Sequence, residues 1–280
     1  LSYDVNTGKA APYSALTIVS TAAWGLGYFG MPHILLRFMA IEDEKKLKLS
    51  RRVATIWVVI SLFVAVFIGV IGYTMSKVGA LEMLTGSNSE TIIVKISALL
   101  SQHGVIFALL AGVILAGILA STMSTSDSQL LAASSAVSSD ILGAFRKDSS
   151  NKNGSIAAAR ITLLVISVVA AFIARNPDSS VFAIVSFAWA GFGAAFGPVV
   201  LFSLFWKRTN KWGALAGMVC GGSMVFIWKY LIRPLGGIWN IYELLPAFLI
   251  ACAAIVIVSL LTPKPSKEIE EEFDRVAQMK

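Results

Sequence analysis

A run of polar residues, Ser121-Thr122-Met123-Ser124-Thr125-Ser126-Asp127-Ser128-Gln129, places hydroxyl, carboxylate and amide oxygens inside an otherwise apolar stretch. Neutral oxygens suit a weakly held alkali cation, because a transport site must bind well enough to fill and weakly enough to empty. Asp127 is costly at membrane depth, which favours a functional role for it. Alternatively, the hydroxyls bond across helices or to carbonyls four residues earlier. The length of the run and its carboxylate favour a cation site.

A second unusual stretch, TIVSTAAWGLGYFGMPHILLRF, is apolar but contains three glycines and a proline: Gly25, Gly27, Gly30 and Pro32. Each glycine costs a helix about 1 kcal/mol and an interior proline about 3 kcal/mol. Freed backbone groups are tolerated at membrane depth only where they line a cavity or meet protein, and transporters build midplane sites from such discontinuous helices. Trp24 and Tyr28, four residues apart, share a helix face. The stretch therefore predicts a substrate site, or alternatively a kinked packing helix with interfacial aromatics.

The elements around these stretches are those of a membrane protein. Of 280 residues, 56% are hydrophobic and only 14% are charged, against about 25% charged in soluble domains. The net charge of +7 does not predict a nucleic-acid partner, because the basic residues lie in short loops, where they set membrane orientation. The sequence contains no zinc, dithiol or phosphate-binding motif, and only Asp127 lies deep in an apolar stretch. We therefore expect no enzyme.

Seven segments approach the length of about 20 apolar residues that a helix needs to cross a bilayer. They are roughly 13–36, 52–76, 104–143, 158–174, 180–206, 212–232 and 241–262. Segment 90–102 is too short to span and predicts an amphipathic surface helix or an external gate element. Small residues recur every fourth position at Gly193 and Gly197 and at Gly213, Gly217 and Gly221, which predicts close helix packing.

The distribution of basic residues predicts the orientation. The loops 37–52, 144–160 and 207–211 and the tail 263–280 carry 17 of the 23 Lys and Arg residues, and the opposite side carries 6. The richer side is cytoplasmic, which places the C-terminus inside and the beginning of the chain outside. The chain starts at Leu1 in a polar stretch without a signal-peptide pattern. We expect it to be a fragment that lacks an upstream part.

Three motifs then resemble one family. WGLGYFGMPHILLRF at 24–38 resembles the substrate-helix motif of the sodium/solute symporter family, and is closest to its bacterial sodium/proline branch. AGILASTMSTSDSQLL at 116–131 resembles that family's sodium-site helix, and RTNKWGALAGMVCG at 208–221 resembles its signature of a basic residue followed by spaced small residues. The motifs occur in the family's order and are spread over most of the chain.

The resemblance implies an all-α integral membrane fold of the leucine-transporter-like inverted-repeat type. Residues 1–206 would form the second five-helix repeat, 207–262 two additional transmembrane helices, and 263–280 a cytoplasmic tail. The first repeat, with the broken helix that completes both sites, would be absent. This chain alone is therefore not expected to transport.

The resemblance also implies sodium-coupled secondary active uptake of L-proline by alternating access, in the inner (plasma) membrane, with sodium co-transported and the lipid bilayer as surroundings. Trp24, Tyr28 and Pro32 would lie at the substrate site. Sodium would bind the Ser124 and Thr125 hydroxyls and the Ser121 carbonyl. Some family members hold a second sodium one turn further along this helix, and the matching positions here are Asp127 and Ser128. The alternatives are another small amino or organic acid as substrate, or a channel or sensor on the same scaffold.

Overall fold

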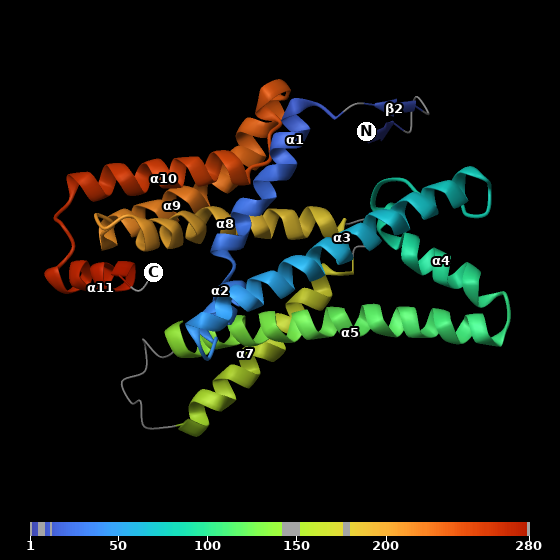
Figure 1. Ribbon diagram of the computed structural model, residues 1–280, viewed down its shortest axis with the longest axis horizontal. Helices are drawn as coiled ribbons and strands as arrows, with labels where there is room; N and C mark the ends of the chain where they lie inside the picture. Colours follow the sequence, from blue (N-terminus) through green and yellow to red (C-terminus); the bar gives the residue numbers. More distant parts are fainter. Residues whose placement is uncertain (1, 5–8, 12, 142–151, 176–179, 279–280) are drawn as a thin grey trace. The chain divides into compact units, whose positions relative to one another are not determined.

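The computed structural model describes the chain except for residues 1, 5–8, 12, 142–151, 176–179 and 279–280 (Figure 1). The chain divides into two compact units, which we describe separately. The first comprises Leu1–Met39 and Phe182–Lys280, and the second comprises Ala40–Val181. Both units are helical. The first also holds a short antiparallel hairpin of β1 (Ser2–Asp4) and β2 (Lys9–Ala11), which is too short to leave a hydropathy signal.

The first predicted span is divided into three pieces in the structure. α1 (Ala15–Ala22) is followed directly by η1 (Ala23–Gly30), a 3₁₀-helix, and then by α2 (Pro32–Met39). Ser14 caps α1, since its hydroxyl accepts from the Thr17 N–H at 3.1 Å. The break predicted from the glycines and Pro32 is therefore confirmed.

Three further helices of the first unit pack around small residues. They are α8 (Val181–Phe205), α9 (Lys211–Ile227) and α10 (Leu244–Leu261). A Cβ added at Gly217 would strike Ile255 of α10, and one added at Gly221 would strike the backbone of Ala194 in α8. Small residues thus let the helix backbones approach closely, as the spacing predicted. The buried cluster between these helices is Ala190, Ala194, Val225, Leu244, Ala247 and Phe248.

Polar contacts join the α8–α9 turn to the end of α10 and to the tail. The Asn210 side chain caps α9 by accepting from the Gly213 N–H at 2.9 Å, and its Nδ2 donates to the Pro263 carbonyl at 2.8 Å. The predicted tail helix is present as α11 (Lys267–Gln278). Lys207 pairs with Asp274 of α11 at 2.6 Å, and this hydrogen bond raises the pKa of Lys207. The tail is therefore attached to the α8–α9 turn.

The second unit contains long apolar helices with a shorter one between them. η2 (Glu44–Lys46) leads into α3 (Leu47–Lys77), and η3 (Gly86–Thr91) leads into α4 (Ile92–Ser101). α5 (Val105–Ser135) continues as a π-helix, η4 (Ala136–Ile141), and α7 (Lys152–Ile173) follows. The prediction of a helix too short to span at 90–102 is thus confirmed by α4.

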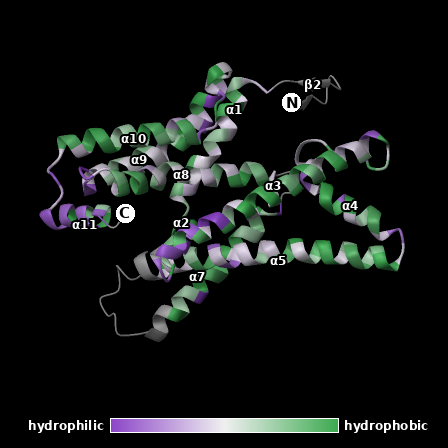
Figure 2. Ribbon diagram, in the orientation of Figure 1, coloured by the Kyte–Doolittle hydropathy of each residue, from purple (hydrophilic) through white to green (hydrophobic). Residues whose placement is uncertain are grey.

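Among the described residues, six helices are long and apolar enough to cross a membrane: Leu47–Lys77, Val105–Ser138, Ile156–Ile173, Val181–Phe205, Lys211–Leu235 and Leu244–Leu261. They match six of the seven predicted spans, although 142–143 of the third span and 144–151 of the loop after it lie outside the described residues. The remaining predicted span, 13–36, is the segment broken into α1, η1 and α2. Figure 2 shows apolar residues running along α3, α5 and α10. Side chains that face outward on these helices suit a lipid surrounding.

Candidate functional site

Local chemistry sets the break in the first segment. Met31 lies between η1 and α2 in an extended conformation, with φ −84° and ψ 115°, which is the conformation favoured before a proline. Pro32 then opens α2, where a missing N–H costs nothing. Pro32 is exposed, whereas Met31 is buried. Pro32 thus starts a helix instead of kinking one.

The indole of Trp24 lies in a stack of aromatic rings. It is nearly parallel to Phe182, Trp189 and Tyr242, with ring centroids 5.4, 5.5 and 5.9 Å away. The Trp189 Nε1–H also donates to the Trp24 carbonyl at 3.0 Å. That hydrogen bond satisfies a backbone oxygen in the broken segment. Trp24 is therefore held both by its ring and by its backbone.

Tyr28 presents a different environment. Its ring meets Trp189 edge-on with centroids 4.8 Å apart, and 51% of the residue is exposed. Trp24 and Tyr28 thus both contact Trp189, although the segment between them is a 3₁₀-helix and not the α-helix that their spacing assumed. Of the two predicted substrate residues, Tyr28 has the more accessible surface and a hydroxyl that can both donate and accept.

Two glycines allow η1 to lie directly against α8. A Cβ at Gly27 would overlap the Trp189 indole, and a Cβ at Gly30 would overlap the Phe192 carbonyl. By contrast, a Cβ at Gly25 would meet nothing within 4 Å. Gly27 and Gly30 are therefore required for close approach, which is one of the functional uses of glycine.

The polar run lies near the middle of α5, in the second unit. Ser121, Ser124, Thr125 and Ser128 follow the spacing i, i+3, i+4, i+7, so they share one face of the helix. The Thr125 hydroxyl donates to the Ser121 carbonyl at 3.3 Å, and the Ser128 hydroxyl donates to the Ser124 carbonyl at 3.0 Å. Asp127 lies at the edge of this face, about 60° from Ser124 and about 100° from Ser128.

These hydrogen bonds correspond to the alternative left open by the sequence, but they do not exclude a cation. A hydroxyl that donates its hydrogen keeps two lone pairs that can accept. The 3.3 Å separation at Thr125 is longer than the usual value of about 2.7–2.8 Å for an O–H···O bond. The Thr125 hydroxyl and the Ser121 carbonyl are thus adjacent oxygens that one ion can share.

The polar run is exposed on its helix. Ser121, Ser124, Thr125 and Asp127 are all exposed on a helix long enough to cross a membrane. Within the part of the chain that the structure describes, Asp127 has no ion pair. Polar groups facing lipid are costly and normally meet protein or a water-filled cavity. The run therefore requires polar partners beyond its own helix.

The broken segment, the polar run and the small-residue faces can be compared with known proteins. The sodium:solute symporter family matches residues 3–221. The chain belongs to the sodium:solute symporter family. With six apolar helices among its described residues, this family member is a multi-pass membrane protein.

The relatives that this chain matches are longer than the chain itself. The sodium/proline symporter of Haemophilus influenzae is 41% identical over 93% of the chain, which covers 51% of the relative. The osmoregulated proline transporter OpuE of Bacillus subtilis is 39% identical over 91% of the chain and 50% of the relative. The sodium/proline symporter of Escherichia coli is 39% identical over 92% of the chain and 50% of the relative. The chain thus spans about half the length of these relatives. No solved structure matches it.

Two residues that surround Trp24 and Tyr28 were not predicted from the sequence. Trp189 contacts both Trp24 and Tyr28, and Tyr242 completes the stack around Trp24. Trp189 lies in a helix that is apolar on all sides, so the pattern gave no reason to assign it a face. The available signal was a tryptophan among the small residues of the sequence FAWAGFG. The predicted substrate residues all lie in the first unit and the predicted sodium residues in the second.

Proposed function

We propose that the transporter containing this chain takes up proline together with sodium, by alternating access, in the inner (plasma) membrane of a bacterium. The observation that carries the proposal is the broken α1–η1–α2 segment, whose sequence resembles the family's substrate motif and lies within the residues that the family matches. The proline transporters that the chain resembles along more than nine-tenths of its length support proline as the substrate and sodium as the coupled ion. Sodium is cargo here, and no resident cofactor is needed.

In this proposal Tyr28 and Pro32 contact proline directly, and Trp24 forms the adjoining wall. The exposure of Tyr28 and Pro32 supports the assignment. The ring stack and the Trp189 hydrogen bond give Trp24 a fixed place beside them. A substrate site that is already formed loses little free energy to ordering when the substrate binds.

Sodium would bind to the hydroxyls of Ser124 and Thr125 and to the backbone carbonyl of Ser121. Three oxygens do not replace a hydration shell, so the remaining ligands would come from the half of the transporter that lies outside this chain. Asp127 and Ser128 would contribute to a second sodium one turn further along α5. The exposure of this run supports a site shared with another part of the protein.

The same proposal assigns the membrane arrangement. Residues 1–206 form the second repeat of a leucine-transporter-like core, 207–262 add two transmembrane helices, and 263–280 are a tail. The 17-to-6 distribution of basic residues places that tail and the C-terminus in the cytoplasm.

Uptake by the full-length transporter in proteoliposomes tests this function. An inward sodium gradient should drive saturable accumulation of proline, and an equal potassium gradient should not. Accumulation that is independent of sodium, or saturable sodium-driven uptake of another amino or organic acid in preference to proline, would contradict the proposal. A sodium current that does not saturate would instead indicate a channel.

A further inference from the structure

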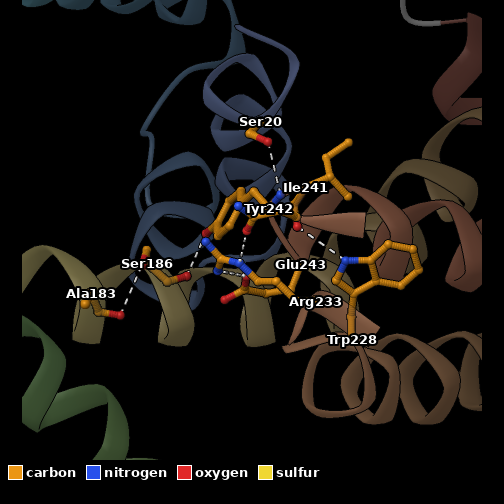
Figure 3. A network of polar contacts seen from close by, with 9 residues as sticks. Ser20, Ala183, Ser186, Trp228, Arg233, Ile241, Tyr242 and Glu243 are labelled. Carbon is orange, nitrogen blue, oxygen red and sulfur yellow. Dashed lines mark hydrogen bonds and ion pairs between the residues drawn. The ribbon is translucent and has the colours of Figure 1, made fainter. Parts of the chain in front are cut away.

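Tyr242 contacts three elements of the first unit, α1, η1 and α8, and Figure 3 shows its polar contacts with Ser20 and Ser186. Its backbone N–H donates to the Ser20 hydroxyl of α1 at 3.1 Å. Its own hydroxyl donates to the Ser186 carbonyl of α8 at 2.6 Å. Its ring stacks on Trp24 of η1, with centroids 5.9 Å apart. One residue of the connection between α9 and α10 therefore contacts both sides of the point where α1 becomes η1.

The connection that carries Tyr242 is itself held by polar contacts. We define it as residues 228–243, which include η5 (Trp228–Ile232), η6 (Arg233–Leu235) and η7 (Gly237–Trp239). Its contacts are Arg233 Nη1 to Glu243 Oε2 at 2.9 Å, Arg233 Nε to Asn240 Oδ1 at 3.0 Å, and Trp228 Nε1 to the Ile241 carbonyl at 3.3 Å. Gly236 and Gly237 both have positive φ. Glycine adopts this backbone conformation without steric cost, which allows the chain to turn from η6 into η7.

Glu243 gives this connection a fixed position. Its side chain is only 2% exposed, whereas that of Arg233 is 41% exposed. A buried carboxylate is strongly destabilising when it loses its partner, so the pair stays formed and Arg233 closes the connection over Glu243. Because Tyr242 precedes Glu243 directly, fixing the carboxylate also fixes the backbone N–H and the ring that reach α1 and η1.

We propose that Tyr242 is a positioning residue for the substrate segment, and that the 228–243 connection is a latch that holds η1 in its binding-competent place. The proposal rests on the proposed function, because it takes η1 as the segment that binds the substrate. No contact between Tyr242 and proline is required. Tyr242 acts through Trp24 and through the end of α1.

A positioning role has a distinct kinetic signature. When the competent state is only partly populated, the apparent dissociation constant rises in inverse proportion to that fraction. Loss of one hydrogen bond shifts such an equilibrium by roughly 2- to 10-fold. We therefore expect Tyr242→Phe, which keeps the stacked ring and removes only the hydroxyl, to raise the KM for proline by about that factor. The maximal rate should change less than twofold.

The matched control removes the same atom elsewhere in the latch. Tyr230 lies in η5 and is 61% exposed, and among the described residues its hydroxyl has no hydrogen-bond partner. Tyr230→Phe should retain the wild-type KM. Ser20→Ala removes the α1 hydroxyl that accepts from the Tyr242 backbone N–H, and it should raise the KM as Tyr242→Phe does. It also keeps the proposal testable if Tyr242→Phe fails to fold.

A second measurement does not depend on which substrate is transported. Gly25→Cys places a thiol in η1 where an added Cβ meets nothing within 4 Å. In the full-length transporter without other cysteines, a maleimide should label this thiol faster in Tyr242→Phe and Ser20→Ala than in Tyr230→Phe. Absence of proline uptake in the wild type would refute the proposed function and leave this comparison intact.

The proposed positioning role is wrong if Tyr242→Phe and Ser20→Ala both match Tyr230→Phe in their KM for proline and in the labelling rate of the Gly25→Cys thiol. A lowered maximal rate with unchanged KM and labelling would also overturn it, because that result assigns Tyr242 to general stability. A raised KM together with faster labelling in both variants supports it.

Discussion

Replacing Gly193 by alanine tests how closely η1, the proposed substrate segment, must lie against α8. A Cβ at Gly193 would lie 2.7 Å from the Gly27 Cα and 3.0 Å from Leu244 Cδ1. Carbon atoms rest at about 3.5–4.0 Å, so the backbones of η1 and α8 would have to separate by roughly 1 Å. Overpacking of this kind costs about 1–3 kcal/mol, offset by about 1 kcal/mol of helix propensity gained.

The functional consequence should exceed the loss of stability. A displacement of about 1 Å in a positioned site costs up to about 100-fold, so we expect the KM of Gly193→Ala for proline to rise roughly 10- to 100-fold. The assay is initial-rate uptake in proteoliposomes with saturating sodium, with thermal unfolding in detergent measured in parallel.

Gly191→Ala is the matched control for this variant. It lies two residues away in α8, and its added Cβ meets nothing within 4 Å. It gains the same helix propensity without the overlap, so its KM should stay at the wild-type value. Equal KM values for Gly193→Ala and Gly191→Ala would refute the close-approach argument.

Three further predictions concern other parts of the chain. A cysteine that replaces Lys46 should not react with an impermeant thiol reagent applied from outside. Labelling from that side would contradict the predicted cytoplasmic position of loop 37–52. Tyr28→Ala should weaken apparent proline affinity at least tenfold while Tyr28→Phe is milder; unchanged uptake in both would remove Tyr28 from the substrate site. The raised pKa of Lys207 means that its pair with Asp274 stabilises α11 fully below about pH 10.5 and is lost as pH rises through that raised pKa. A spin label on α11 should therefore become more mobile in strong alkali, and already at neutral pH in Asp274→Asn; equal mobility of the two proteins at neutral pH would contradict this.

Much of the fold could be predicted because membrane helices are encoded by the length and hydropathy of single segments. α3, α5, α7, α8, α9 and α10 each contain enough apolar residues to span, and the break at η1 followed from Gly25, Gly27, Gly30 and Pro32. The 3₁₀ form of η1 did not follow. The glycines and Pro32 predicted a break but not the backbone conformation within it.

The candidate site was only partly predictable. The spacing of Ser121, Ser124 and Thr125 gave a single face of α5 from the helix period alone. Trp189 and Tyr242 were missed because their partners are distant in sequence, with Tyr242 and Ser20 separated by 222 residues. Hydropathy patterns contain no information on such pairs.

The most direct test of sodium coupling is proline binding to the full-length transporter across a sodium titration. Thr125→Ala removes one proposed sodium ligand without adding bulk, and Thr125→Ser keeps the oxygen. An interaction with a charged group contributes about 1.5–3 kcal/mol, so sodium affinity should fall roughly 10- to 100-fold in Thr125→Ala and little in Thr125→Ser.

Because coupling between two ligands is reciprocal, apparent proline affinity should fall with sodium affinity in Thr125→Ala. High sodium should restore part of it. Ser124→Ala should behave in the same way. A sodium dependence that is unchanged from the wild type in both Ser124→Ala and Thr125→Ala would remove α5 from the sodium site and contradict the account.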